Sequence, residues 1–197
     1  MTKRLDKYQL ILDAAAEAIA ESGFYQCQVS KIARKAGVAD GTIYLYFKNK
    51  EDILIRLFQE RMGKFIALVR SRLDQCHTTG ARLKVIIETH FTHMEQNRAM
   101  ALVTQLEVRQ SDPRIRAAIK EPVLEYLKII EEVVQQGIAA GEIAGNVSVR
   151  AARQMIFGGM DEAVTDWVMG HKPKPLLDQV DSMFYLFSGA LRLQNED

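Results

Sequence analysis

Helical periodicity runs through nearly the whole of this 197-residue chain. Apolar residues recur three and four positions apart, which is the spacing of one face of an amphipathic helix. No stretch combines sustained alternation of apolar and polar residues with flanking hairpin turns, as the strands of a half-buried sheet would. The sequence therefore predicts an all-α fold, and the breaks in the pattern indicate about nine helices.

Composition narrows the class of protein. Hydrophobic residues make up 48% of the chain and charged residues 26%, which is typical of a folded, water-soluble protein. There is no apolar run long enough to span a bilayer, and the start MTKRLDKYQL has no signal-peptide core. We therefore expect a cytoplasmic protein with no membrane contact. Cys27 and Cys76 have no metal-ligand spacing, so no redox or metal site is predicted.

Residues 31–54, KIARKAGVADGTIYLYFKNKEDIL, form a segment of much shorter helices. The apolar spacing from Val29 to Ala36 predicts one short helix, which Gly37 would end. A second short helix is expected to begin near Asp40 and to end by Asn49, which would cap a long fourth helix. Two short helices joined by a tight turn that contains glycine are typical of a helix-turn-helix.

On a helical wheel, the second short helix has two distinct sides. Ile43 and Phe47 point toward the first short helix, whereas Gly41 and Leu45 point outward. Hydroxyl and ammonium side chains border the outward side, which suits the major groove of DNA, and Leu45 could contact a thymine methyl. We expect DNA contacts from Gln28, Ser30, Asp40, Gly41, Thr42, Tyr44, Leu45, Tyr46, Lys48 and Lys50.

The charge of this region agrees with a DNA partner. Residues 24–50 carry five basic groups and one acid, Asp40, giving a local charge of +4 although the whole chain carries only +1. Lys50 would lie at the start of the fourth helix, where free backbone N–H groups favour a phosphate. Charge alone fits a solvated basic face equally well. The DNA prediction therefore depends on finding these charges on a helix-turn-helix.

The run IARKAGVADGTIYLYFKNKEDIL, residues 32–54, resembles the DNA-binding motif of the TetR family of transcriptional repressors. This resemblance implies an all-α homodimer with a DNA-binding domain at residues 1–50 and a ligand-binding and dimerisation domain at 51–197. It also implies that helices four to seven enclose a ligand and that the last two helices form the dimer interface. The wide apolar surface of those last helices agrees, since it requires two partners.

Two positions depart from the family pattern. The family often has Thr where this chain has Gln28, and Ser where it has Ala39. Both family residues can cap the helix that follows them. We therefore expect Gln28 to contact phosphate in another way and Asp40 to become the N-cap of the third helix.

Residues 28–54 together with SDPRIRAAIKEPVLEYLKII, residues 111–130, are similar to a subgroup of the family, the FadR fatty-acid-degradation repressors of Bacillus-type bacteria. The similarity implies a long-chain acyl-CoA effector that releases DNA, and no other cofactor. Such an effector needs an apolar tunnel and cations for the CoA phosphates. The candidates are Phe91, Met94, Arg98, Met100, Val103, Leu106, Arg109, Arg153, Phe157, Met160 and Trp167. Individually, these residues would also fit an ordinary core and an ordinary charged surface.

Two other functions stay open from the sequence. A repressor of efflux genes would respond to a drug-like molecule, and a buried carboxylate at Glu88, Glu107 or Asp161 would favour that effector. An all-α enzyme or protein-interaction module would instead carry the helix-turn-helix incidentally. His90 and His93 are three residues apart but have no recognisable ligand pattern, and no catalytic triad can be assigned, so an enzyme is disfavoured.

Overall fold

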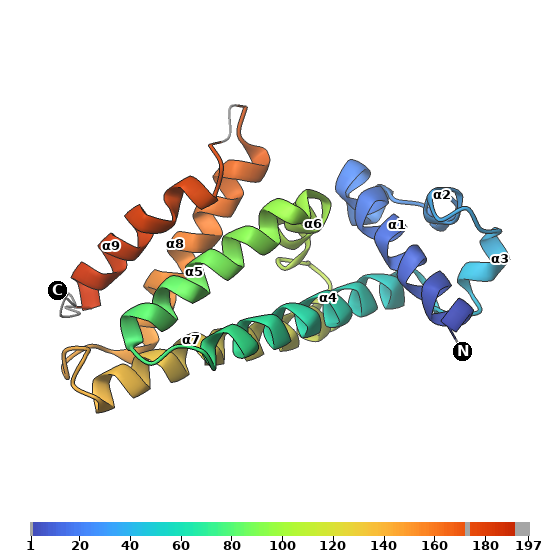
Figure 1. Ribbon diagram of the computed structural model, residues 1–197. Helices are drawn as coiled ribbons and strands as arrows, with labels where there is room; N and C mark the ends of the chain where they lie inside the picture. The colour runs from blue at the N-terminus through green and yellow to red at the C-terminus, as the bar shows by residue number, and fades with distance from the viewer. Residues whose placement is uncertain (1, 172–173, 192–197) are drawn as a thin grey trace. The chain divides into compact units, whose positions relative to one another are not determined.

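The computed structural model describes residues 2–171 and 174–191. No strand occurs in these ranges, which confirms the predicted all-α fold. In chain order the helices (Figure 1) are α1 Thr2–Gln26, α2 Val29–Lys35, α3 Asp40–Ile43, α4 Lys50–Leu73, α5 Thr79–Gln96, α6 Arg98–Glu107, α7 Pro113–Ala139, α8 Val149–Met169, the 3₁₀ helix η1 Leu177–Gln179 and α9 Val180–Leu191.

The helices pack into two compact units that do not follow chain order. The first unit comprises the chain up to Gly63 together with Arg98–Pro122, and the second comprises Lys64–Asn97 and the chain from Val123 onward. Helices α4 and α7 each contribute residues to both units. The functional division at residue 50 stays a prediction, because packing alone does not assign DNA or ligand binding to either side.

In the first unit, α1 packs against both α2 and α6. One apolar face of α1 lies in the core of this unit, with Ile11, Leu12 and Ile19 at 0% exposure. Gly23 interrupts α1 with a φ of 72°, a conformation that residues with a Cβ rarely adopt. The chain bends there, so that Phe24 and Tyr25 leave the helix axis near the first residues of α4.

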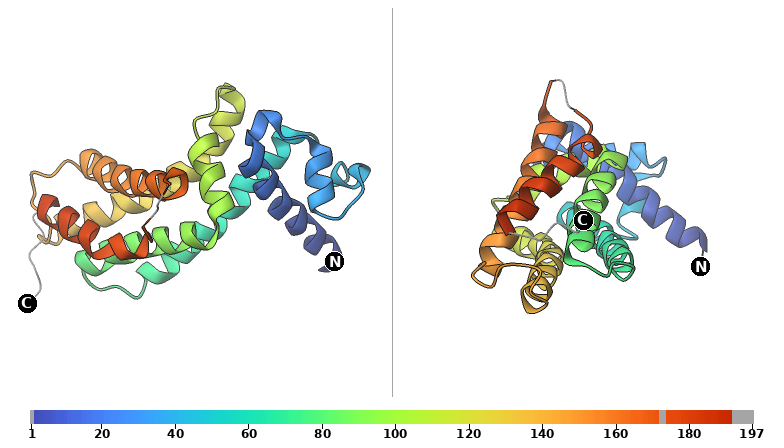
Figure 2. Two further views of the ribbon diagram at one scale, coloured as in Figure 1. Left: turned by 90° about the horizontal axis from the view of Figure 1, so that it is seen from above. Right: turned by 60° about the vertical axis from the view of Figure 1, so that its left-hand side comes forward.

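In the second unit, α5 lies against α8 and α9, which also contact each other (Figures 1 and 2). Gly159 lies where α8 approaches α9, and a Cβ there would be only 2.9 Å from Cζ of Phe187, so a larger residue would force this ring to shift. Residues of α4 and α7 complete the core. For example, the rings of Phe65 and Tyr126 meet edge to face with their centroids 4.9 Å apart.

Candidate DNA-binding surface and effector site

The helix-turn-helix has the inward and outward sides that the helical wheel predicted. Ile32, Ile43 and Phe47 are all buried, and the ring of Phe47 stacks on Tyr8 of α1 at a centroid distance of 5.1 Å. This contact holds the chain beyond α3 against α1. The outward residues are therefore presented from a small, well-packed core.

The outward side exposes several of the predicted DNA contacts. The exposed fractions are 58% for Tyr44 and 72% for Leu45, and Gly41 and Lys48 are exposed beside them. Gln28 and Asp40 are also exposed, whereas Ser30, Thr42, Tyr46 and Lys50 are partly covered. The ring of Tyr46 lies 6.5 Å from that of Tyr8, so its ring partly packs on α1. Contact with DNA stays a prediction for each of these residues.

The predicted cap of the third helix is wrong. Ala39, not Asp40, occupies the N-cap position, and its side chain makes no capping hydrogen bond. Asp40 is already the first residue of α3, where its carboxylate can interact favourably with the helix dipole but is not placed as a cap. The helix itself spans only four residues and continues as turns, with Tyr46 and Phe47 donating backbone hydrogen bonds to the carbonyl of Ile43.

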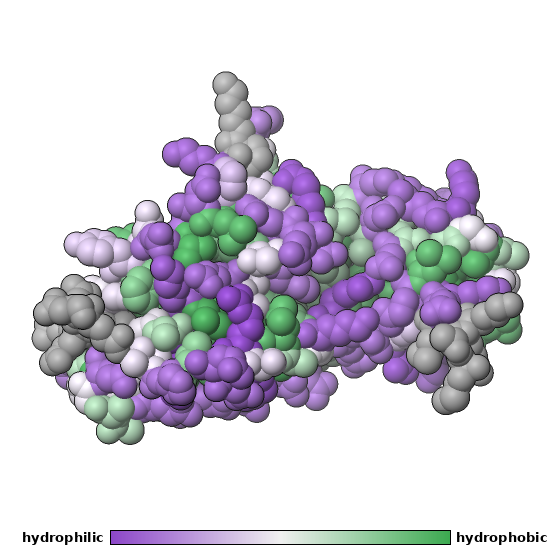
Figure 3. All heavy atoms as spheres, viewed as in Figure 1, coloured by the Kyte–Doolittle hydropathy of each residue, from purple (hydrophilic) through white to green (hydrophobic). Residues whose placement is uncertain are grey.

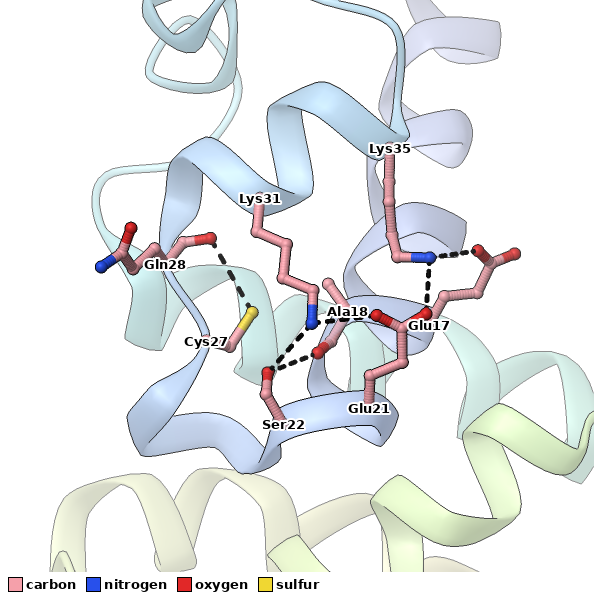
Figure 4. A network of polar contacts seen from close by, with 8 residues as sticks. All are labelled: Glu17, Ala18, Glu21, Ser22, Cys27, Gln28, Lys31 and Lys35. Atoms are coloured by element: carbon pink, nitrogen blue, oxygen red, sulfur yellow. Dashed lines mark hydrogen bonds and ion pairs between the residues drawn. The ribbon is translucent and has the colours of Figure 1, made fainter.

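Ion pairs between α1 and α2 neutralise part of the basic charge. Lys31 lies 2.9 Å from Glu21, and Lys35 lies 2.8 Å from Glu21 and 3.3 Å from Glu17 (Figure 4). Hydrogen bonds from the two lysines lower the pKa of Glu21 to about 2, so it stays ionised. The charge of +4 counted from residues 24–50 therefore overstates the field available to a polyanion, because both acids lie outside that window.

Lys50 is also tied to the protein. Its ammonium group donates hydrogen bonds to the carbonyls of Phe24 and Tyr25, at 3.0 and 3.1 Å, and lies over the ring of Phe24. These interactions join the start of α4 to the bend that follows Gly23. Asn49 caps α4 as predicted, since its side-chain oxygen accepts a hydrogen bond of 2.8 Å from the backbone N–H of Asp52.

The bend after Gly23 is also held by residues at the end of α6 and just beyond it. The backbone N–H of Phe24 donates to the carboxylate of Glu107 at 3.0 Å, and Gln110 donates to the same carboxylate. The hydroxyl of Tyr25 donates to Gln110 at 2.9 Å. We call this cluster of Phe24, Tyr25, Lys50, Glu107 and Gln110 the α1–α6 junction. The sequence gives no sign of this cluster, because its contacts from Phe24 to Glu107 and from Tyr25 to Gln110 join residues more than 80 positions apart.

The predicted effector residues fall into two groups. Six belong to the second unit: Phe91, Met94, Arg153, Phe157, Met160 and Trp167. Phe91, Met94 and Met160 are buried and the other three are partly covered. Arg153 does not present a free cation, because its Nε lies 3.1 Å from the carboxylate of Glu131.

The other five belong to the first unit: Arg98, Met100, Val103, Leu106 and Arg109. Met100 and Val103 are buried, whereas Leu106 and both arginines are exposed. Participation of all eleven residues in one effector site stays a prediction.

A buried polar pair in the second unit was not predicted as a site. His90 and Tyr126 are almost fully buried, and Nδ1 of His90 lies 3.2 Å from the Tyr126 hydroxyl. Burial lowers the pKa of His90 to about 4, with a smaller opposing effect of Asp161. His90 is therefore neutral near pH 7. Its position on the apolar face of α5 was visible in the sequence, but its partner lies 36 residues away.

The carboxylates considered for a drug-like effector have partners in the protein. Glu88 pairs with Arg72 at 3.1 Å, and Glu107 is buried in the α1–α6 junction. Within the described ranges, no group of three or more His, Cys, Asp and Glu side chains is arranged to hold a metal ion. In those same ranges, no helix combines the length and apolar character needed to cross a bilayer.

Apolar and aromatic side chains are exposed on the last helices, as the wide apolar faces predicted. They are Met169, Leu177, Tyr185 and Leu186. Tyr185 is 76% exposed and Leu186 63% exposed. Figure 3 shows apolar surface among polar residues where α9 faces the viewer. A contiguous apolar patch rimmed by polar residues commonly marks an interface.

Nearly the whole chain is similar to known proteins. Residues 11–57 match the family described as bacterial regulatory proteins of the TetR family, and residues 58–190 match the C-terminal region of YsiA-like proteins. The fatty acid metabolism regulator protein of Bacillus subtilis is 48% identical over 191 residues, which is 97% of this chain and 98% of the relative.

Solved structures agree. The crystal structure of FadR from Bacillus subtilis in complex with stearoyl-CoA has a TM-score of 0.87 and 49% identity, covering 91% of this chain and 97% of that one. FadR from Bacillus halodurans has a TM-score of 0.90 and 46% identity, covering 95% and 97%. These relatives are transcriptional regulators, so the expectation that the chain is not an enzyme is confirmed. The chain belongs to the TetR family of bacterial regulatory proteins.

Proposed function

We propose that the protein is a dimeric transcriptional repressor that controls fatty acid degradation and leaves its palindromic operator when it binds long-chain acyl-CoA. The observation that carries this proposal is the 48% identity to the Bacillus subtilis fatty acid metabolism regulator over 97% of the chain. Identity of this extent covers both compact units. It therefore supports a common effector class as well as a common DNA-binding fold.

The exposed residues that follow α3 support the DNA half of the proposal. Tyr44, Leu45 and Lys48 extend from a core fixed by Ile43 and Phe47, so that an aromatic hydroxyl, an apolar side chain and an ammonium group lie within five positions. These groups can contact phosphate and base edges together. One such element per chain requires a dimer for a palindrome, with its recognition elements about 34 Å apart.

The second unit supports the effector half. Phe65, Phe91, Phe157 and Tyr126 form a cluster of aromatic side chains at α5, and Met94 and Met160 add flexible apolar side chains. A fatty acyl chain is an apolar ligand of matching character. A cationic drug would instead need an uncompensated carboxylate. Of the three candidates, Glu88 and Glu107 already have donors, and Asp161 is not free of interactions either.

Dimerisation through α8 and α9 follows from their exposed apolar side chains. A second copy would cover Leu186 and Tyr185 and fix the distance between two DNA-binding surfaces. As a regulator of bacterial genes, the protein would act in the cytoplasm. Effector binding would favour a conformation with unsuitable spacing, which requires tighter effector binding to that conformation than to the DNA-bound one.

The test begins with selection of binding sites from a pool of random DNA duplexes by the full chain. We expect a palindromic site whose affinity falls steeply with salt, because each phosphate contact releases counterions. Fluorescence anisotropy should then show release of the labelled site by stearoyl-CoA. Stearate and free CoA serve as controls and should release much less DNA. Absence of salt-sensitive binding, or failure of stearoyl-CoA to release the site, would overturn the proposal.

A further inference from the structure

The starting observation is an unpaired nitrogen in the core of the second unit. Nε2 of His90 is buried and has no hydrogen-bond partner among the described residues, whereas Nδ1 faces the Tyr126 hydroxyl at 3.2 Å. The exposed fractions are 4% for His90 and 1% for Tyr126. A buried polar atom without a partner is uncommon in folded proteins, because removing it from water is unfavourable.

Counting donors and acceptors identifies which tautomer is preferred. If Nδ1 carried the proton and donated to Tyr126, the tyrosine proton and the lone pair of Nε2 would both lack partners. If Tyr126 donates to Nδ1, only the N–H at Nε2 lacks one. Burial raises the pKa of Tyr126, so its hydroxyl keeps the proton that it donates. The second arrangement leaves fewer unsatisfied groups, and it makes Nε2 a donor.

Four aromatic rings surround the imidazole of His90. The ring of His90 stacks on Tyr126 at 5.7 Å and meets Phe65, Phe91 and Phe157 edge to face at 5.9, 6.1 and 6.5 Å. The titratable groups that act on His90 are Asp161 and His93, and both are secondary to burial. A hydrogen bond made here is strong because the local dielectric constant is low.

We propose that the Nε2 N–H of His90 donates a hydrogen bond to the thioester carbonyl of acyl-CoA and thereby selects the thioester. This inference rests on the proposed function. It adds the atom that recognises the ligand, and it makes His90 a specificity-determining residue.

The chemistry of the ligand points to the thioester. The acyl chain offers no acceptor, and the CoA phosphates carry charges that an apolar, aromatic site would exclude. The thioester carbonyl lies between them and is a neutral acceptor, which a neutral donor in such a site can satisfy without burying a charge. A free fatty acid would instead bring an ionised carboxylate, whose burial is strongly unfavourable. His90 therefore favours the activated acyl group over the free acid.

The test compares two ligands that differ only in the carbonyl. Calorimetric titration of the full chain uses stearoyl-CoA and S-octadecyl-CoA, a thioether in which CH₂ replaces C=O, both below their micellar concentrations. We expect the wild-type protein to bind stearoyl-CoA about tenfold more tightly, because the thioether leaves the donor unsatisfied. In His90→Phe the affinities for the two ligands should become equal, even if the altered side-chain shape weakens the binding of both. His90→Gln can restore an N–H and should recover part of the ratio between the affinities for stearoyl-CoA and S-octadecyl-CoA.

His93→Gln is the matched control, since His93 lies on the same helix and its ring packs 4.8 Å from Phe65. The ratio of the two ligand affinities in His93→Gln should remain near that of the wild type. If His90→Phe does not fold, Tyr126→Phe replaces it, and removing the hydroxyl that fixes the tautomer should also lower the ratio. Equal binding of both ligands by the wild type, or an unchanged ratio in these variants, overturns the inference and leaves the proposed function intact. Failure of the wild type to bind stearoyl-CoA overturns both.

Discussion

The two compact units place their polar side chains differently. In the first unit, charged groups hold short helices together at the edges: Lys31 and Lys35 join α2 to Glu21, and Lys50 and Glu107 hold the bend at Phe24. In the second unit, ion pairs such as Arg72–Glu88 also join helices, but there a polar pair lies in the core as well. Aromatic rings surround His90, and its hydrogen bond to Tyr126 is buried among them.

This difference fits the two kinds of recognition proposed above, of DNA by the first unit and of an acyl chain by the second. A unit that meets a polyanion can use lysines both for its own packing and for binding, but a lysine already paired with carboxylates contributes less to binding. A unit that meets an apolar ligand depends on the shape of its core, and a single polar group inside it can confer selectivity. Substitutions of exposed residues in the first unit should therefore affect mainly DNA binding, whereas substitutions of apolar core residues in the second unit should affect mainly folding.

The largest expected effect is on folding. Phe91→Ala removes a fully buried ring from α5 and should lower the free energy of unfolding by about 3–5 kcal/mol. Leu45→Ala removes an apolar side chain that is 72% exposed, so it should change stability by under about 0.5 kcal/mol while weakening operator binding. Urea unfolding and DNA titration of both variants measure the two quantities. Equal losses of stability in Phe91→Ala and Leu45→Ala would contradict the expected difference between core residues of the second unit and exposed residues of the first.

An intermediate effect concerns pH. Burial lowers the pKa of His90 from 6.5 to about 4, so between these values the unfolded chain takes up a proton that the folded chain does not. Stability should therefore fall as the pH drops below 6.5, with a contribution of about 2 kcal/mol at pH 5.

His90→Gln removes this titration and supplies the comparison. Its free energy of unfolding should decline less than that of the wild type between pH 7.5 and pH 5, as measured by urea unfolding in matched buffers. The same decline in both proteins would mean that His90 is not the neutral, buried group described above.

The smallest expected effect is a difference between two lysines of the first unit in the salt dependence of DNA binding. Lys48 is exposed, and its ammonium group forms no ion pair among the described residues, whereas Lys35 lies between Glu17 and Glu21. Lys48→Ala should reduce the slope of log affinity against log salt by about 1, as expected for one lost phosphate contact. Lys35→Ala changes the net charge equally and should alter the slope much less. Equal slopes would refute the idea that the ion pairs withdraw Lys35 from DNA.

Local features of the fold were predictable from the sequence. The spacing of Ile43 and Phe47 identified the buried side of the recognition element, and Asn49 identified the start of α4. Both depend on interactions within a few residues, which periodicity and capping rules describe. The assignment of Asp40 as a cap failed because the helix begins one residue earlier than a side-chain cap there would require.

Features that join distant residues were not predictable. Pairing of Lys31 and Lys35 with acids of α1 depends on how two helices pack, and so does the direction of the Lys50 ammonium group. The N–H at Nε2 of His90 becomes notable only once Tyr126 is known to lie against Nδ1. Sequence patterns gave these residues correct helical positions but no partners.

The α1–α6 junction has a consequence for building hybrid repressors. The chain leaves the first unit after Gly63 and returns to it at Arg98, so this unit is assembled from two separate pieces of sequence. A transplant that ended near Gly63 would lack the Glu107 carboxylate that accepts from the backbone of Phe24. A hybrid repressor intended to keep its operator preference would therefore also have to include Arg98–Pro122. Because the first unit consists of two segments of the chain, a hybrid joined at a single position cannot contain all of it.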